Sequence, residues 1–180
     1  MKNFSLTPRL LFVLGALFIA ALTRFIPHPP NFTAIGGIAL FAGACIPNKW
    51  LSLLLPITVM LITDAVIGFH DTLGAVYLSF SLITMIGWLM RDRQNILGFV
   101  GTSITASILF FVITNSAVWL AGFWSSVPIG YPKSIDGLIL ALNAGIPFFT
   151  NTLISQFAYG ILFFGAFHFA KTWKPSLSKI

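Results

Sequence analysis

The sequence predicts an all-α integral membrane protein, a six-transmembrane-helix bundle with both ends in the cytoplasm. Hydrophobic residues make up 57% of the 180 positions and charged residues only 8%, whereas a soluble domain carries about 25% charged residues. A core of this size cannot hide so much apolar surface from water, so lipid must be the solvent for much of it. The length suits a single transmembrane domain that covers residues 1–180.

Charges, prolines and turn residues divide the chain into apolar segments close to the ~20 residues that a membrane-crossing helix needs. The six predicted helices cover residues 7–26, 33–46, 50–69, 73–90, 95–120 and 150–172. The second of them is short and rich in glycine and alanine. The segment 121–149 contains three prolines. Within it, Ser134 as an N-cap and Asp136 in the first turn predict a short helix over 134–144 that lies on the bundle.

Lysine and arginine set the predicted orientation. With the N-terminus inside, eight of the ten basic residues fall in cytoplasmic segments, and only Arg24 and Lys133 fall outside. This N-in/C-in topology requires an even number of spans, which agrees with six. Because the basic residues lie in short loops between apolar segments, the formal charge of +6 does not indicate nucleic acid binding. The predicted location is the cell membrane (inner or plasma), crossed several times.

Asp64 is the most informative single residue, because it lies in a predicted helix with apolar residues on both sides. A carboxylate at membrane depth costs about 2.5 kcal/mol or more, so it should face the bundle interior and a partner. Arg24 lies at a similar depth on the first helix. Two interpretations remain open: an Asp64–Arg24 pair that fixes helix packing, or a contact to a ligand or an ion.

Polar and aromatic side chains gather at the predicted outer ends of several helices. Aromatic rings beside a few hydrogen-bonding groups suit a small-molecule pocket, although tryptophan and tyrosine also collect at membrane interfaces. Interhelical hydrogen bonds would explain each polar residue alone, but their common depth predicts a shared cavity. The candidate substrate-binding residues are Asn31, Asp64, His70, Tyr77, Asn115, Trp119, Asn151 and Gln156.

Small residues on the first two predicted helices indicate close helix contacts. Ala16 and Ala20 form a small-xxx-small motif, and Ala39 and Gly43 form another. Such a face serves either packing within the chain or docking of another membrane subunit.

Sequence signatures of catalysis are missing, since the chain has no H-E-x-x-H, G-x-S-x-G or P-loop motif. The single cysteine, Cys45, excludes a disulfide within the chain. His28, His70 and Asp71 could meet in the outer loops to hold a metal, but histidines in such loops are more often surface hydrogen-bonding residues. We therefore expect no enzyme activity, no cofactor and no resident metal.

Several segments carry a family resemblance that covers nearly the whole chain. They are TRF (23–25), PPNFT (29–33), IALFAG (38–43), TDA (63–65), VYLSF (76–80), TN (114–115) and PFFTNT (147–152). The chain resembles the substrate-binding S components of energy-coupling factor (ECF) vitamin transporters. Within them it is most similar to the solitary cobalamin S components and a related family of transport proteins.

The resemblance implies six helices around an outward-facing vitamin pocket, and a first helix that docks through Ala16 and Ala20 on a transmembrane coupling subunit. It also implies two cytoplasmic ATPases that drive toppling of the subunit, which fits a chain without an ATP-binding motif. The cobalamin group often carries a cysteine in the outer loop before the fourth helix. Here that loop, residues 68–75, has none, and His70 is its one obvious metal ligand.

The function predicted from these observations is that of a substrate-binding membrane subunit of a vitamin or micronutrient importer. Such a subunit would take a small molecule from the outer face and release it inward with the help of an ATP-driven coupling module. Two alternatives remain. One is a membrane-embedded enzyme acting on a lipid-like substrate, with Asp64, His70 and Asp71 as acid/base groups. The other is a small ion or proton carrier that uses Asp64.

Overall fold

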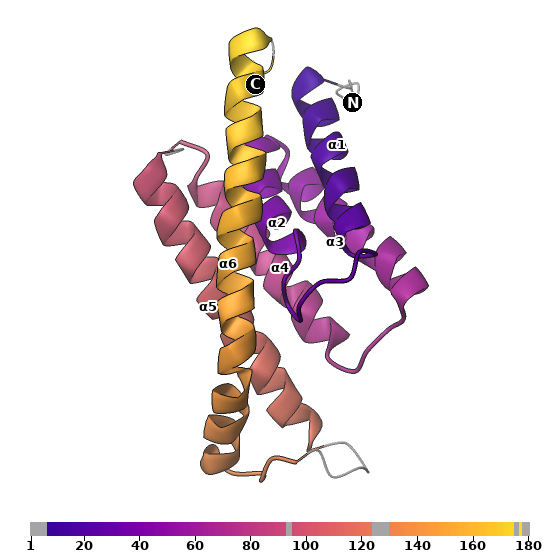
Figure 1. Cartoon of the computed structure of the whole chain (residues 1–180), viewed down its shortest axis with the longest axis vertical. Coiled ribbons are helices and arrows are strands. Elements are labelled where there is room, and N and C mark those ends of the chain that lie inside the picture. Colours follow the sequence, from indigo (N-terminus) through magenta and orange to yellow (C-terminus); the bar gives the residue numbers. More distant parts are fainter. Residues whose placement is uncertain (1–6, 93–94, 124–129, 175–176, 178–180) are drawn as a thin grey trace.

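The computed structural model describes residues 7–92, 95–123, 130–174 and 177. These residues form six α-helices and no strand. The helices are α1 (Pro8–Thr23), α2 (Ile35–Cys45), α3 (Lys49–Ile67), α4 (Leu73–Leu89), α5 (Ile96–Ala121) and α6 (Ile135–Trp173). Figure 1 shows that α1 begins and α6 ends at one end of the bundle, here called the terminal end. The connections 24–34, 68–72 and 130–134 lie away from the terminal end, the first near mid-height and the last at the far end of the molecule; this side of the bundle is here called the cavity end.

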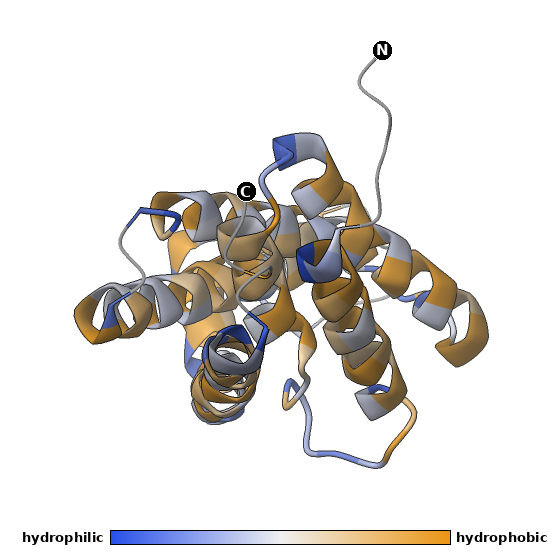
Figure 2. Ribbon diagram, turned by 90° about the horizontal axis from the view of Figure 1, so that it is seen from above, coloured by the Kyte–Doolittle hydropathy of each residue, from blue (hydrophilic) through white to orange (hydrophobic). Residues whose placement is uncertain are grey.

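The helices are those of a membrane protein. Three of them, α3, α5 and α6, are long and apolar enough to cross a membrane, while α1, α2 and α4 are shorter apolar helices. Large hydrophobic side chains such as Trp50, Ile62 and Leu97 are exposed on the surface of the bundle. In Figure 2 the hydrophobic colour dominates the helices, and the hydrophilic colour is found mainly near helix ends and in connections. Lipid is the solvent that such a surface requires.

The short helix α2 is the centre of the bundle. It contacts the five other helices, and every one of its residues except Gly36 is buried. Glycines make this possible, because Gly43 of α2 and Gly87 of α4 lie so close that a Cβ on either would overlap the backbone of the other helix. Gly37 lies in the same way against the backbone of Gly160 in α6. The predicted small-residue face of this helix therefore packs within the chain.

The small residues of α1 also face inward, which corrects one expectation. The exposed fractions of Ala16 and Ala20 are 6% and 0%, and both residues belong to the hydrophobic core. They let α1 approach α2 and α3, the helices it contacts. The assignment of Ala16 and Ala20 to subunit docking is therefore wrong. The exposed face of α1 instead carries large side chains such as Phe18 and Ile19.

The largest departure from the predicted helices is α6. It is one continuous helix of 39 residues with Pro147 inside it, so the predicted short helix over 134–144 is its beginning. Ser134 is its N-cap as predicted, and the Ser134 hydroxyl accepts a hydrogen bond from the backbone N–H of Gly137. A proline removes one backbone hydrogen bond from a helix interior, yet the helix continues through Pro147. Gly145, two residues earlier, lies against the side chain of Asn115 in α5. The other five helices begin and end within three residues of the prediction.

Arg91 closes the terminal end of α2. Its guanidinium donates hydrogen bonds to the carbonyl oxygens of Gly43 (2.9 Å), Ile46 (2.6 Å) and Pro47 (3.0 Å). The last carbonyls of a helix have no partner within the helix, and a nearby arginine both satisfies them and complements the negative end of the helix dipole. These three carbonyl oxygens at the end of α2 are thus paired within the chain.

Candidate functional site

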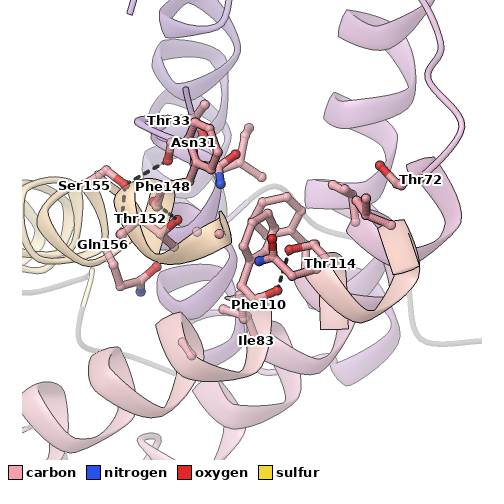
Figure 3. A pocket seen from close by; sticks show the side chains of 18 of the residues that line it. Asn31, Thr33, Thr72, Ile83, Phe110, Thr114, Phe148, Thr152, Ser155 and Gln156 are labelled. Atoms are coloured by element: carbon pink, nitrogen blue, oxygen red, sulfur yellow. Dashed lines mark hydrogen bonds between the residues drawn. The ribbon is translucent and has the colours of Figure 1, made fainter. Parts of the chain in front are cut away.

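A cavity of about 550 Å³ lies at the cavity end of the bundle, between α2, α4, α5 and α6 (Figure 3). Part of its wall is apolar and comes from Phe80, Ile83, Phe110 and Phe148. The remaining wall carries hydroxyl and amide groups, among them those of Asn31, Thr33, Thr72, Thr114, Asn115, Thr152, Ser155 and Gln156. Small-molecule sites typically measure ~300–1,000 Å³ and combine an apolar wall with a few polar groups. The cavity has both properties.

Four of the eight candidate substrate-binding residues line this cavity: Asn31, His70, Asn115 and Gln156. They come from the α1–α2 connection, the α3–α4 connection, α5 and α6, which are far apart in the sequence. The shared cavity predicted from their common depth is therefore present. That these side chains contact a ligand stays a prediction.

Asp64 and Tyr77 lie behind the cavity wall rather than on it. The Asp64 carboxylate is 1% exposed and forms an ion pair with Arg24, with 2.6 Å between Nη2 and Oδ1. The Tyr77 hydroxyl donates a hydrogen bond of 2.7 Å to the second carboxylate oxygen. The packing interpretation of Asp64 is thus the one that the geometry favours, because both of its oxygens have partners from neighbouring elements.

Arg24 connects this buried pair to the cavity, which it lines. Its Nη1 donates a hydrogen bond of 2.6 Å to the Thr63 hydroxyl and a longer one of 3.5 Å to the Met60 carbonyl. With Asp64 also bound, the guanidinium is fixed on three sides by α3. The Arg24 guanidinium therefore has a fixed position at the cavity wall.

Trp119 and Asn151 hold connecting segments and do not line the cavity. The Trp119 indole N–H donates to the carbonyl of Pro132 (3.0 Å). The Asn151 amide donates to the carbonyl of Pro30 (3.0 Å). Both are predicted substrate-binding residues, but their polar atoms bind the backbone of the cavity rim.

The rim segment 27–33 is fastened to α6 by two side chains one helical turn apart. Besides the Asn151 bond, the Ser155 hydroxyl lies 3.4 Å from the carbonyl oxygen of Asn31, to which it donates (Figure 3). Asn31 itself has φ = 63°, a left-handed conformation that asparagine adopts more readily than most other residues. The turn therefore places the Asn31 side chain at the cavity.

Gln156 differs from the other polar residues of the cavity. It is 2% exposed, and its Nε2 atom has no hydrogen-bond partner among the described residues. Its Oε1 atom occupies the place that a Cβ on Gly36 would need, so the amide lies directly against the start of α2. A buried amide nitrogen without a partner costs about 1–3 kcal/mol.

Several lining residues escaped the sequence analysis as candidates, notably Phe80, Phe110 and Phe148. An aromatic residue inside an apolar helix has the same sequence pattern whether it faces lipid, core or cavity. One usable signal existed: Phe110 with Thr114, and Phe148 with Thr152, are four residues apart, so each pair shares a helix face.

The histidines of the cavity end make local hydrogen bonds. The His28 ring donates from Nδ1 to the Pro29 carbonyl at 3.0 Å, and the His70 ring bonds to the Thr72 hydroxyl at 3.2 Å. In the part of the chain that the structure describes, no three His, Cys, Asp or Glu side chains come together as metal ligands.

Comparison with known proteins gives one match. The model of a family described as "Family of unknown function (DUF6580)" matches residues 4–177. No curated protein and no solved structure matches the chain.

Proposed function

This chain belongs to the DUF6580 family, and we propose that it is the substrate-binding membrane subunit of an importer for a vitamin or similar micronutrient. The observation that carries the proposal is the cavity of about 550 Å³, with its apolar wall and separate polar groups, at one end of a membrane bundle. The subunit would bind its substrate there and release it on the other side with the help of an ATP-driven coupling module. The resemblance to ECF S components supports the same function.

The distribution of basic residues supports an outward-facing cavity. Among the described basic residues, Arg9, Lys49, Arg91, Lys171 and Lys174 lie at the terminal end, and Arg24 and Lys133 at the cavity end. Because cytoplasmic segments are the ones enriched in lysine and arginine, the terminal end is assigned to the cytoplasm. The cavity would then open toward the outside, where an importer meets its substrate.

All six helices belong to the proposed transmembrane bundle, including those shorter than a full span. With 11 residues, α2 is only about 17 Å long, well short of the ~30 Å hydrocarbon core. It nevertheless contacts the five other helices, so protein rather than lipid surrounds it. An N-in/C-in protein with six helices in the membrane is consistent with this arrangement.

The proposed coupling subunit and its two ATPases would need a surface other than the one first assigned. Ala16 and Ala20 are buried, so the contact would involve side chains that face outward.

The first test is mass spectrometry of a denatured extract of the purified protein. We expect a small molecule in stoichiometric amount from the wild type and its loss from Phe110→Trp, which enlarges an aromatic side chain of the cavity wall. Phe169→Trp is the matched control, because Phe169 is exposed on α6, and it should retain the molecule. Equal amounts of the molecule in both variants would contradict binding in this cavity. Chemical conversion of the bound molecule by the purified protein would favour an enzyme instead.

A further inference from the structure

The first turn of α2 is a largely buried helix end whose N–H groups have no partner in the part of the chain that the structure describes. Ala34, Ile35 and Gly37 are buried, and the N-cap residue Ala34 offers no side-chain acceptor. Within the described part of the chain, the backbone N–H groups of Ile35, Gly36 and Gly37 donate to no acceptor. Helix N-terminal N–H groups in a buried place need an acceptor from a side chain, water or ligand.

The other helix starts show that this chain normally provides a cap. The side chains of Thr7, Asn48, Asn95 and Ser134 accept a backbone N–H at the starts of α1, α3, α5 and α6. The two helices without a side-chain cap are α2 and α4, and both begin at the cavity. The two helix starts that have no side-chain cap therefore both lie at the cavity wall.

Gln156 supplies a second and independent observation at the same place. Its Oε1 atom lies against Gly36, in the first turn of α2, while its Nε2 atom is buried without a partner in the described residues. Gly36 and Gln156 both line the cavity. This part of the cavity wall therefore carries hydrogen-bond donors that have no partner in the described residues. They are the backbone N–H groups of Ile35 and Gly36, which line the cavity, and the amide NH₂ group of Gln156.

The charge at this spot suits a monoanion. The cavity lining includes Arg24 but no aspartate or glutamate, and the Arg24 charge is already matched by Asp64. A helix N-terminus contributes the equivalent of about half a positive charge. This is enough to favour a single negative charge and too little to balance the roughly two charges of a phosphate monoester. A carboxylate matches both the charge and the set of donors.

We propose that the first turn of α2 and the Gln156 amide bind a carboxylate group of the substrate. The substrate class is then a small carboxylic acid whose apolar body lies against Phe80, Phe110 and Phe148. This inference rests on the proposed function, since it names the substrate class of the same cavity.

The test compares acids with neutral counterparts of nearly equal shape by thermal shift in detergent. The pairs are benzoate and benzamide, nicotinate and nicotinamide, biotin and biotinamide, and pantothenate and panthenol. We expect at least one acid to bind about tenfold or more tightly than its neutral counterpart, a difference of ~1.4 kcal/mol. Gln156→Glu keeps the side-chain shape but adds a negative charge, so it should remove this preference and leave the neutral compound unaffected.

Ser103→Ala is the matched control. Ser103 of α5 is also buried and has no side-chain partner among the described residues, but it does not line the cavity. It should leave the preference for acids unchanged. If Gln156→Glu fails to fold, Gly36→Ala replaces it, because the added methyl group crowds the flexible Gln156 amide.

The outcomes separate this inference from the proposed function. Equal binding of acids and neutral counterparts would leave the cavity as a binding site and overturn the carboxylate assignment. A preference for acids that survives Gln156→Glu and Gly36→Ala would place the carboxylate elsewhere and overturn the site. The absence of a thermal shift with every acid would overturn the substrate class.

Discussion

The two ends of α2 differ in whether the chain supplies hydrogen-bond partners for their backbone groups. At the terminal end, the guanidinium of Arg91 binds three carbonyl oxygens, those of Gly43 in the last turn of the helix, of the C-cap residue Ile46 and of Pro47 just beyond it. At the cavity end, the first-turn N–H groups have no acceptor in the described residues, and the arginine nearby, Arg24, is bound to Asp64 instead. One end is satisfied by the chain itself, and the other leaves donors for something outside the chain. Departures from full pairing are expected at functional sites.

The largest effect is expected where α2 meets α4 near the terminal end. Gly87→Val places a side chain where the Leu40 carbonyl and the Gly43 backbone already lie, and overpacking of a core costs about 1–3 kcal/mol or more. We expect loss of monodisperse protein in detergent, measured by size-exclusion chromatography. Gly101→Val is the control, because no atom lies within 4 Å of a Cβ at Gly101. Similar behaviour of the two variants would show that the close contact is unimportant.

The next effect concerns the buried ion pair at the cavity end. Asp64→Asn leaves the Arg24 charge without its partner, and breaking a buried pair in this way costs up to about 3–5 kcal/mol. The value should fall below that range, because Arg24 borders the cavity and is partly exposed. Thermal unfolding in detergent would measure the loss, and the double variant Arg24→Gln/Asp64→Asn should recover part of it. No recovery would contradict a pairwise interaction.

The same Asp64→Asn variant also sharpens the comparison of the two ends. With the Arg24 charge no longer matched, the cavity gains positive potential. Carboxylates should then bind more tightly than they do to the wild type, while their amides bind equally well. A thermal-shift titration with benzoate and benzamide measures this. Weaker binding of benzoate would show that Asp64 acts on the substrate by another route.

A smaller loss of stability is expected from the cap at the terminal end. Arg91→Met removes three hydrogen bonds that a charged group donates, and one such bond contributes about 1.5–3 kcal/mol to stability. Water can reach this partly exposed end of the helix and replace some of the lost bonds. We expect a destabilisation of about 1–3 kcal/mol in thermal unfolding. Arg91→Lys should recover only part, since an ammonium cannot reproduce the fork of donors. Carboxylate binding should remain unchanged.

The smallest effect should have the opposite sign. Gln156→Leu removes a buried amide whose nitrogen has no partner in the described residues, so the ligand-free protein should gain about 1 kcal/mol. Stabilisation combined with loss of function is typical of residues kept for binding. Unfolding of protein freed of bound small molecules is the measurement. A destabilised variant would show that the amide serves the fold.

Five of the helices were predictable because prolines, charges and turn residues bound them in the sequence. The sixth was not, because Pro147 looks like a helix end in the sequence, whereas the helix continues through it and packs along α5, with Gly145 against Asn115. The depth of polar residues predicted a cavity, but depth does not say which way a side chain faces. Asn115 lines the cavity, whereas Asn151 binds the rim backbone. The small-residue motif of α1 fits an inner and an outer face equally well, so its spacing could not identify Ala16 and Ala20 as core residues.

The contact between Gly43 and Gly87 has a consequence for the history of the family. A Cβ at either glycine would overlap the backbone of the partner helix, so a side chain at either position would force the two helices apart. Lipid-facing positions such as Ile62 and Leu97 are exposed and are free to drift among apolar residues. Distant descendants of this protein should therefore keep a glycine on each of these two helices after most of the surrounding sequence has diverged.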